Sequence, residues 1–181
     1  MNRKRKRSTC DIRPAVAQDA NAIIGLNSNV VELTSPMDKK RFELLFSQCA
    51  LIIVAERNGA IVGFLMGFDG NCQYDSANFK WFRSRLASFF YVDRVVVSET
   101  NRGTGIGKAF YQYIRNWSRD QRIETLAAEM NLEPANEASL AFHRSESFIQ
   151  VGTRNPSEGK VLSMQTANCS TANEAQPTKA E

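Results

Sequence analysis

The feature that most constrains the fold is a strand-like run followed closely by alternating glycines and a helix-like run. The run "FFYVDRVVV", residues 89–97, is apolar and β-branched, as expected of a strand. Gly103, Gly105 and Gly107 follow, and "IGKAFYQYIRNW" then places apolar residues at helical spacing. The first turn of a helix exposes unpaired N–H groups, and glycines let a backbone curl around an anion. The pattern predicts a phosphate-binding loop between a strand and a helix.

Two common phosphate-binding loops do not fit this spacing. A Walker A loop has a glycine five positions before its Gly-Lys pair and a Ser or Thr after the lysine, where this chain has Arg102 and Ala109. A dinucleotide fingerprint has its third glycine where Lys108 stands. The pattern that remains is Arg-x-x-Gly-x-Gly, formed by Arg102, Gly105 and Gly107.

The rest of the chain is predicted to alternate strands and helices in the order β-α-α-β-β-β-α-β-α-β-β. A helix over 35–49 is expected to begin with Ser35 as its cap and Pro36 in its first position. The sequence Asn58-Gly59 between two apolar runs predicts a β-hairpin. Residues 69–88 show no clean period, and we expect a functional loop there. The other expected elements are a strand and helix in 10–27, a helix to about residue 119, a strand over 124–131, a helix over 134–146, and strands over 148–153 and 160–166.

The Arg-x-x-Gly-x-Gly motif in this context resembles the signature of the GNAT superfamily of acetyl-CoA-dependent N-acetyltransferases. A second resemblance lies in "AAEMNLEPANEASLAFHRSESF", residues 127–148. It is similar to the family's Glu-containing strand followed by Asn-x-x-(Ser/Ala)-x-x-x-Tyr-x-x-x-Gly-Phe. The sequence departs from that pattern at His143, where many members carry a tyrosine, and at Ser147, which replaces a glycine. The likeness extends over residues 9–166, and it is strongest over 89–148.

The resemblance implies an α/β fold with a mixed, mostly antiparallel central sheet, flanked by helices and splayed open to bind CoA. The end of the strand over 89–97 would pair its backbone with the pantetheine arm, the glycine loop would hold the pyrophosphate, and the asparagine before the second helix would contact the arm. The residues that the resemblance assigns to acetyl-CoA are Val95, Val96, Val97, Arg102, Gly103, Thr104, Gly105, Ile106, Gly107 and Asn136.

The implied reaction is transfer of an acetyl group from acetyl-CoA to a primary amine by direct attack. Glu129 or Asp93 would remove the amine proton, and His143 would protonate the departing sulfur. The acceptor would be a small-molecule or peptide amine, whose identity the sequence does not give. Catalysis by Cys49 or Cys72 is a weaker alternative, because neither lies in a motif with the histidine.

Simpler interpretations stay open for each of these residues. Asp93 and Glu129 can face solvent on their strands, His143 can be a surface histidine, and Asn136 can be only a helix cap. A different class of function is a non-catalytic acyl-CoA-binding or regulatory module on the same fold, because a fold does not fix a function. Cofactor binding without thiol release would identify that class.

Composition excludes several other classes of protein. The 181 residues carry a formal charge of +4, but the first seven, "MNRKRKR", hold five basic residues, so a nucleic-acid partner is not indicated for the remainder. A single histidine and four cysteines without CxxC spacing argue against a metal site. No apolar run is long enough for a membrane span, and we expect a cytoplasmic protein with reduced thiols. A homodimer is left open. We expect one domain over residues 9–167, between a basic tail (1–8) and a polar tail (168–181), both disordered.

Overall fold

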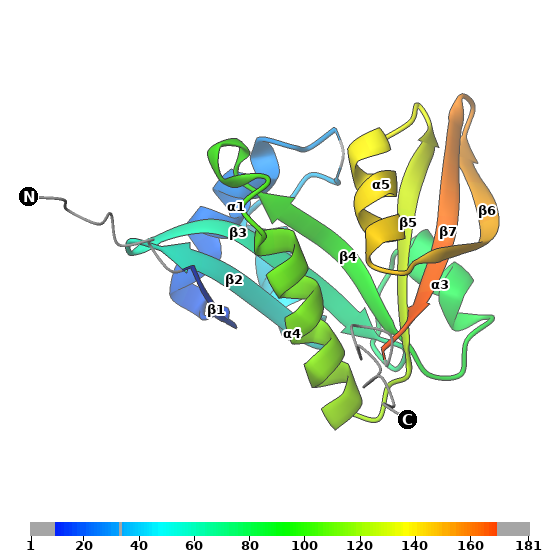
Figure 1. The fold of residues 1–181 in the computed structure, drawn as a ribbon, viewed down its shortest axis with the longest axis horizontal. Helices are drawn as coiled ribbons and strands as arrows, with labels where there is room; N and C mark the ends of the chain where they lie inside the picture. The colour runs from blue at the N-terminus through cyan, green and yellow to red at the C-terminus, as the bar shows by residue number, and fades with distance from the viewer. Residues whose placement is uncertain (1–9, 33, 170–181) are drawn as a thin grey trace, which may run out of the picture.

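The computed structural model describes residues 10–32 and 34–169, so most of both expected tails lies outside the described residues. A single seven-stranded sheet has the order β1-β2-β3-β4-β5-β7-β6, and every neighbouring pair is antiparallel except β4 and β5 (Figure 1). The mixed, mostly antiparallel α/β fold expected from the sequence is confirmed. The strands are β1 (Asp11–Pro14), β2 (Leu51–Arg57), β3 (Ala60–Asp69), β4 (Phe90–Val97), β5 (Thr125–Glu133), β6 (Ile149–Ser157) and β7 (Lys160–Asn168). The helices are α1 (Ala20–Ser28), α2 (Lys39–Gln48), α3 (Ala77–Arg83), α4 (Ile106–Asp120) and α5 (Glu137–Ser145), with short 3-10 turns at Ala17–Asp19 and Glu99–Asn101.

Helices cover both faces of the sheet, because alternate residues along each strand point to opposite faces. On one face α1, α2 and α3 bury Ile23, Leu45 and Phe79 against strand residues such as Phe64. On the other face α4 and α5 pack against the opposite side chains of the same strands, including Leu65. The amphipathic stripe expected for α4 is present, since Ile106, Phe110 and Ile114 are buried while Tyr113 and Trp117 are half-buried.

The β2–β3 hairpin forms at the Asn-Gly turn that the sequence predicts. Asn58 and Gly59 both have positive φ, at 53° and 77°, which is the conformation that a two-residue hairpin turn requires. The two strands then pair from Arg57↔Ala60 to Leu51↔Gly67. This hairpin, with β1 and β4 on its two sides, makes the N-terminal part of the sheet.

The sheet splits between β4 and β5. These parallel strands pair only at Phe90↔Leu126 and Tyr91↔Ala127, whereas β4 pairs with β3 along its whole length. In Figure 1 the two strands meet at their lower ends and separate upward, with α5 beside β5. Beyond Tyr91, the edge of β4 that faces β5 is therefore free of strand pairing.

Two elements differ from the sequence prediction. The expected loop over 69–88 contains α3, which is capped where the Ser76 hydroxyl accepts from the Phe79 N–H at 3.3 Å. Helix α2 begins at Lys39 because Asp38 caps it, accepting from the Arg41 N–H at 2.7 Å. The Ser35 carbonyl, expected at the start of α2, instead accepts a hydrogen bond from a buried arginine of β4.

The C-terminal end of the packed region lies slightly beyond the expected domain. Strand β7 extends to Asn168, and Cys169 is buried, with its N–H donated to the Glu124 carbonyl at 2.8 Å. The division of the chain into one domain and two tails otherwise stays a prediction.

Candidate active site

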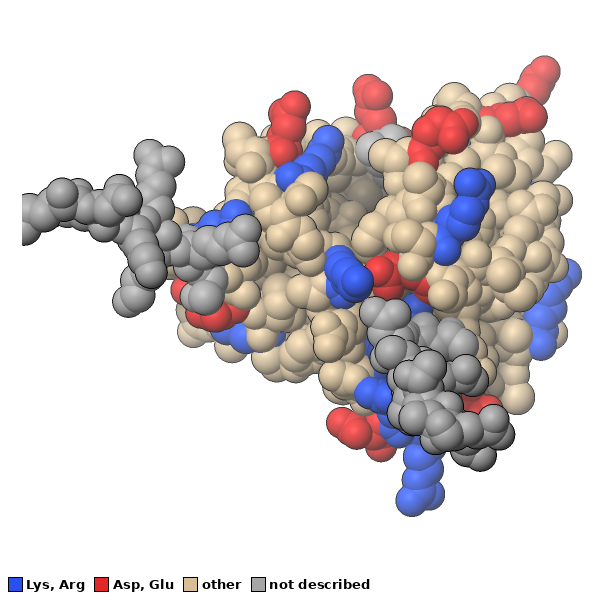
Figure 2. All heavy atoms as spheres, viewed as in Figure 1, with Lys and Arg blue, Asp and Glu red and all other residues tan. Residues whose placement is uncertain are grey.

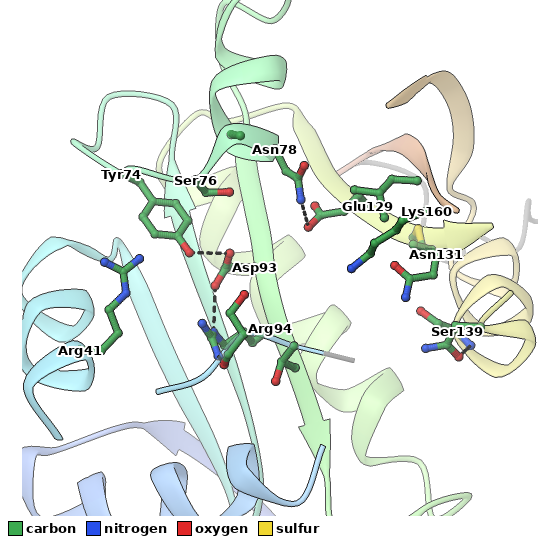
Figure 3. Close-up of a pocket in the computed structure, with 16 residues that line it drawn as sticks. Arg41, Tyr74, Ser76, Asn78, Asp93, Arg94, Glu129, Asn131, Ser139 and Lys160 are labelled. Carbon is green, nitrogen blue, oxygen red and sulfur yellow. Dashed lines mark hydrogen bonds and ion pairs between the residues drawn. The ribbon is translucent and has the colours of Figure 1, made fainter. Parts of the chain in front are cut away.

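A polar cavity of about 350 Å³ opens where β4 and β5 separate. Its walls come from the segment before α2, from α2 and α3, from β4 and β5, from the start of α5 and from β7, so elements distant in sequence meet there (Figure 3). Most of the side chains are amides, hydroxyls or charged groups. The lining residues are Thr34, Ser35, Arg41, Tyr74, Ser76, Ala77, Asn78, Asp93, Arg94, Glu129, Met130, Asn131, Asn136, Ser139, Lys160 and Leu162.

Glu129 lies on the β5 wall and receives hydrogen bonds from neutral donors only. The Tyr91 hydroxyl donates to the two carboxylate oxygens at 2.9 and 2.8 Å, and the Asn78 amide donates to Oε1 at 2.8 Å. No Lys or Arg among the described residues forms an ion pair with it. Burial, with a smaller effect from the charge of Asp93, raises the pKa of Glu129 to about 7.

Asp93, on the β4 wall, is compensated by a cation. Arg94 Nε donates to Asp93 Oδ2 at 3.1 Å, and the Tyr74 hydroxyl donates to Oδ1 at 2.8 Å. Burial raises the pKa of Asp93, while the Arg94 charge and these hydrogen bonds oppose the rise. Arg94 Nη1 also donates to Asn27 Oδ1 at 2.7 Å and to the Ser35 carbonyl at 2.6 Å, so the pair fastens α1 and the following segment to the sheet.

The orientation of the Asn78 amide is fixed from its other side. Arg154 Nη1, on the edge strand β6, donates to Asn78 Oδ1 at 2.7 Å. The oxygen of the amide therefore faces Arg154 and its NH₂ group faces Glu129. A chain of hydrogen bonds thus runs from β6 through α3 to the carboxylate on β5.

The glycine loop is open where an anion would bind. Gly103 and Gly105 have φ of +71° and +90°, and a Cβ added at either position would meet no atom within 4 Å. Both glycines are thus needed for backbone conformation beside an open surface. Gly107 has a different cause, because its Cβ would lie 3.1 Å from the Phe142 ring, so it lets α4 approach α5.

The loop is also braced by the side chains around it. Arg57 Nη1 donates to Asn101 Oδ1 at 2.7 Å, and the Thr104 hydroxyl donates to the Asn101 carbonyl at 2.7 Å. Arg102 is exposed, with its Nε directed to the Val97 carbonyl at 3.3 Å. The first turn of α4, from Ile106, points its unpaired N–H groups toward the same region. These residues fit a pyrophosphate.

The other residues expected to bind CoA lie at the split itself. Val95, Val96 and Val97 lie on the part of β4 that pairs with β3 but not with β5. Val96 is buried, and the other two are half-buried. Asn136 lines the cavity and caps α5, accepting from the Ser139 N–H at 3.1 Å. The cavity therefore brings together Asn136 and both carboxylates, whereas residues 95–97 follow its lining residue Arg94 along β4 and are not among the lining residues themselves.

His143 is not among the residues that line the cavity. It is buried between α4 and α5, and its ring packs against the rings of Tyr111, Phe142 and Phe148. Nδ1 lies 2.8 Å from the Ser139 carbonyl and must carry the proton, so Nε2 accepts from the Tyr111 hydroxyl at 2.7 Å. Burial lowers the pKa of His143 to about 4, which favours a neutral ring.

Sequence reasoning missed most of the partners that define the two carboxylates. Tyr91 had a signal, because it lies two residues before Asp93 on the same face of β4. Asn78 had none, since α3 itself was not predicted. Arg94, Lys160 and Tyr74 contact the cavity only because the split brings their elements together.

Several expected absences concern the described part of the chain. Within residues 10–32 and 34–169, no group of three His, Cys, Asp or Glu could hold a metal ion, and no helix is long and apolar enough to cross a membrane. Both charge signs are interspersed among the described residues on the face shown in Figure 2. Cys49 and Cys72 do not line the cavity, and burial raises the pKa of the Cys49 thiol to about 12, which makes it a poor nucleophile.

Comparison with solved structures gives the same fold. An N-acetyltransferase from Staphylococcus aureus Mu50 superposes with a TM-score of 0.68 at 20% identity, covering 90% of this chain and 99% of that one. A putative acetyltransferase from Salmonella typhimurium, solved with its cofactor acetyl-CoA, has a TM-score of 0.66 at 19% identity over 96% and 100%. A ribosomal-protein-alanine N-acetyltransferase from Brucella melitensis has a TM-score of 0.66 at 24% identity over 87% and 99%.

A search of curated protein sequences found no match. The acetyltransferase (GNAT) family model, by contrast, matches residues 19–148, which include α1, the glycine loop, both carboxylates and α5. This range covers most of the chain, and the splayed sheet agrees with it. The chain belongs to the acetyltransferase (GNAT) family.

Proposed function

We propose that this protein transfers the acetyl group of acetyl-CoA to a primary amine by direct attack, with Glu129 as the proton acceptor. The observation that carries the proposal is a carboxylate without a cationic partner at the wall of the cavity, with its pKa raised to about 7. A group with that pKa is both ionised and protonated in substantial fractions near neutral pH, as a general base requires. Asp93 is less suited to accept a proton, because the positive charge of Arg94 compensates the charge of its carboxylate.

The open backbone around the split supports a proposed position for the cofactor. The pyrophosphate would bind Arg102, the loop Gly103-Thr104-Gly105 and the first turn of α4 at Ile106 and Gly107, where the added-Cβ positions of Gly103 and Gly105 are free. The pantetheine arm would pair with the unpaired edge of β4 at 95–97 and contact Asn136. In this proposed position the thioester would lie at the opening that Glu129 lines.

The reaction needs one carboxylate and fixed N–H donors. Acetyl-CoA supplies the acetyl group: the amine nitrogen bonds to its carbonyl carbon, and the C–S bond breaks to release the thiolate. Glu129 takes the proton from the ammonium form of the acceptor before attack. Free N–H groups on the β5-facing edge of β4 stabilise negative charge on the carbonyl oxygen.

After attack the nitrogen loses a second proton, and we assign to water its transfer to the departing thiolate. His143 does not line the cavity and its ring is held neutral by Tyr111 and the Ser139 carbonyl. Tyr74 lines the cavity but donates to Asp93, and burial raises its pKa well above the usual value, which makes it a poor acid. We therefore propose His143 as a packing residue instead of the general acid.

Free-thiol release with acetyl-CoA over a panel of primary amines tests the activity, with CoA binding measured in parallel. We expect thiol release with at least one amine and tight CoA binding to the wild type. Gly105→Asp should abolish binding, because it places a negative charge and a strained φ of +90° beside the pyrophosphate. Gly159→Asp is the matched control, since Gly159 also has positive φ (69°) but lies in the β6–β7 turn.

The alternative function is a non-catalytic acyl-CoA-binding module. It predicts that CoA binds, that Gly105→Asp weakens binding, and that no amine in the panel releases thiol. The same two measurements therefore separate the classes. CoA binding to Gly105→Asp as tight as to wild type contradicts the placement of the cofactor in either class.

A further inference from the structure

Two charged groups of the cavity have no partner of opposite charge among the described residues. Lys160 lines the cavity, and Figure 3 shows its ammonium group directed into the space beside Glu129 and Asn131. Neither Lys160 nor Glu129 forms an ion pair with any described residue. They also do not pair with each other, so the cavity presents one acidic and one basic group separately.

The remaining charges of the cavity are already compensated. Arg94 pairs with Asp93 at 3.1 Å, and Arg41 makes two hydrogen bonds to Asp75, at 2.9 and 2.7 Å. A charged side chain with an opposite charge beside it contributes little net charge to a ligand. The charge available for recognition is therefore one negative and one positive group.

Lys160 is presented by a tight turn. It begins β7 directly after Gly159, whose φ of 69° closes the β6–β7 hairpin, and it pairs with Ser157 across the turn. The backbone here is held by pairing with β6 at Lys160 itself and with β5 at the next residue, Val161, so the base of the side chain is held at the cavity wall. A lysine here acts as a point charge for an anionic group.

We propose that the acceptor amine carries a carboxylate, as a free amino acid does, and that Lys160 selects it by binding that carboxylate while Glu129 receives the ammonium. This inference rests on the proposed function. The cavity volume of about 350 Å³ lies at the small end of ligand sites, as expected for a small acceptor. Its lining of hydroxyls and amides suits a polar zwitterion and disfavours an aromatic amine.

Other acceptor classes fit the charges less well. A polyamine would bring its second ammonium group toward Lys160 and meet repulsion at close range. A peptide N-terminus would bring a neutral amide where a free amino acid has its carboxylate, and Lys160 would stay without a counter-ion. Both classes are outcomes of the experiment below.

The experiment uses three matched sets, built on serine, glutamine and methionine. Each set contains the amino acid, its carboxamide and the amine left after decarboxylation, with spermidine and seryl-alanyl-alaninamide as further probes. Binding to the full chain saturated with CoA is measured by calorimetry, and thiol release with acetyl-CoA gives kcat/KM. We expect at least one amino acid to bind at least tenfold more tightly than its carboxamide and its decarboxylated amine.

The variants tie that preference to one side chain. Lys160→Met should remove most of the preference for the acid over the amide, and Lys160→Arg should keep part of it. Lys40→Met, an exposed lysine of α2 that does not line the cavity, should leave the preference unchanged. Equal binding of acid and amide by the wild type in every set, a retained preference in Lys160→Met, or preferred binding of spermidine or the peptide each overturns the proposal. Binding decides this inference without turnover, so selective binding with no thiol release contradicts the acetyltransferase activity and leaves the selection by Lys160 standing.

Discussion

The two arms of the split sheet carry chemically similar side chains in different electrostatic surroundings. On β4, Asp93 is held by the Arg94 guanidinium and the Tyr74 hydroxyl; on β5, Glu129 is held by the Tyr91 hydroxyl and the Asn78 amide. The first carboxylate has a full counter-charge and the second has only neutral donors. Hydrogen bonds from neutral donors orient a carboxylate, but they offset its burial less than a cation does.

In the proposed mechanism this difference separates a structural carboxylate, Asp93, from one that exchanges a proton, Glu129. Arg94 is itself tied to Asn27 and to the Ser35 carbonyl, so protonating Asp93 would disturb the attachment of α1. Glu129 has a pKa of about 7, and a change in its protonation disturbs only neutral partners. The sequence left the two as equal candidates, and their contacts distinguish them.

The strongest test of the comparison is Glu129→Gln. Glutamine keeps the size of the side chain but cannot accept the ammonium proton, so we expect kcat for thiol release to fall by about 10²–10⁴-fold. Acetyl-CoA affinity should change by less than about threefold, because the proposed cofactor contacts lie on the glycine loop and β4. Activity within threefold of wild type would mean that the base is another group.

The matching test on β4 is Arg94→Met, measured by urea unfolding. Removing one partner of a buried ion pair leaves an uncompensated charge, which costs about 3–5 kcal/mol of unfolding free energy. Adding Asp93→Asn to Arg94→Met should recover part of this loss, because the second substitution removes the orphaned charge. If Arg94→Met alone unfolds like wild type, Asp93 is not compensated by Arg94 and the two arms are electrostatically alike.

The sequence predicted the frame of the site better than its chemistry. The strand before Val97, the glycine loop and the cap of α5 at Asn136 follow local rules of periodicity and capping, and all are present. The split itself could not be derived from periodicity, because the point where β4 and β5 stop pairing depends on elements packed on both faces. The resemblance to a family, not the residue pattern, supplied that expectation.

The partners of the carboxylates depend on contacts that sequence spacing does not specify. Asn78 reaches Glu129 across 51 positions, and Arg154 reaches Asn78 across 76. Helix α3 is short, so its period is too brief to distinguish from a loop with aromatic residues. His143 presents the opposite case: the motif position implies a general-acid role, whereas the ring is buried and hydrogen-bonded to Tyr111 and the Ser139 carbonyl, and its role in catalysis stays a prediction.

A finer test concerns the neutral donors on the β5 arm. Asn78→Leu removes the amide that donates to Glu129, and a hydrogen bond to the charged form of a carboxylate lowers its pKa. The pKa of Glu129 should therefore rise, and the acidic limb of the kcat/KM profile should move to higher pH by about one unit. At a pH well above that limb, activity should return toward wild type, which a general structural defect would not allow.

Arg154 gives the graded version of the same test. Arg154→Met leaves Asn78 in place but frees its amide to rotate. The acidic limb of the kcat/KM profile should therefore also move to higher pH, by a smaller amount than in Asn78→Leu. Arg85→Met serves as the control and should leave the limb in place. Arg85 lies two residues after α3, with its guanidinium carbon 4.1 Å from the centroid of the Trp81 ring. An unchanged profile in Asn78→Leu contradicts the assignment of that limb to Glu129.

The smallest expected effect on catalysis is that of His143→Phe. The ring is enclosed by Tyr111, Phe142 and Phe148. It is neutral because a charged imidazolium is unfavourable in this buried environment. A phenylalanine preserves most of the packing. We expect kcat within about twofold of wild type. A fall of 10²-fold or more, in a variant that still binds acetyl-CoA, would restore the general-acid role that the family resemblance implies.

Stability should show where His143 does act. Its pKa in the folded state, about 4, lies below the unfolded value of 6.5, so between these values the unfolded chain binds a proton that the folded chain does not. The contribution of the neutral His143 ring to the free energy of unfolding is therefore complete above pH 6.5 and is lost as the pH falls toward 4. Over this range the free energy of unfolding changes by about 3 kcal/mol. His143→Phe should lose the Tyr111 hydrogen bond at pH 7, yet its unfolding free energy should fall less steeply than that of wild type between pH 6.5 and 4. The unfolding free energies are measured by urea unfolding at each pH. If they fall equally with pH in the two proteins, the His143 ring titrates alike in the folded and unfolded states, and a ring accessible enough to do so could also reach the cavity.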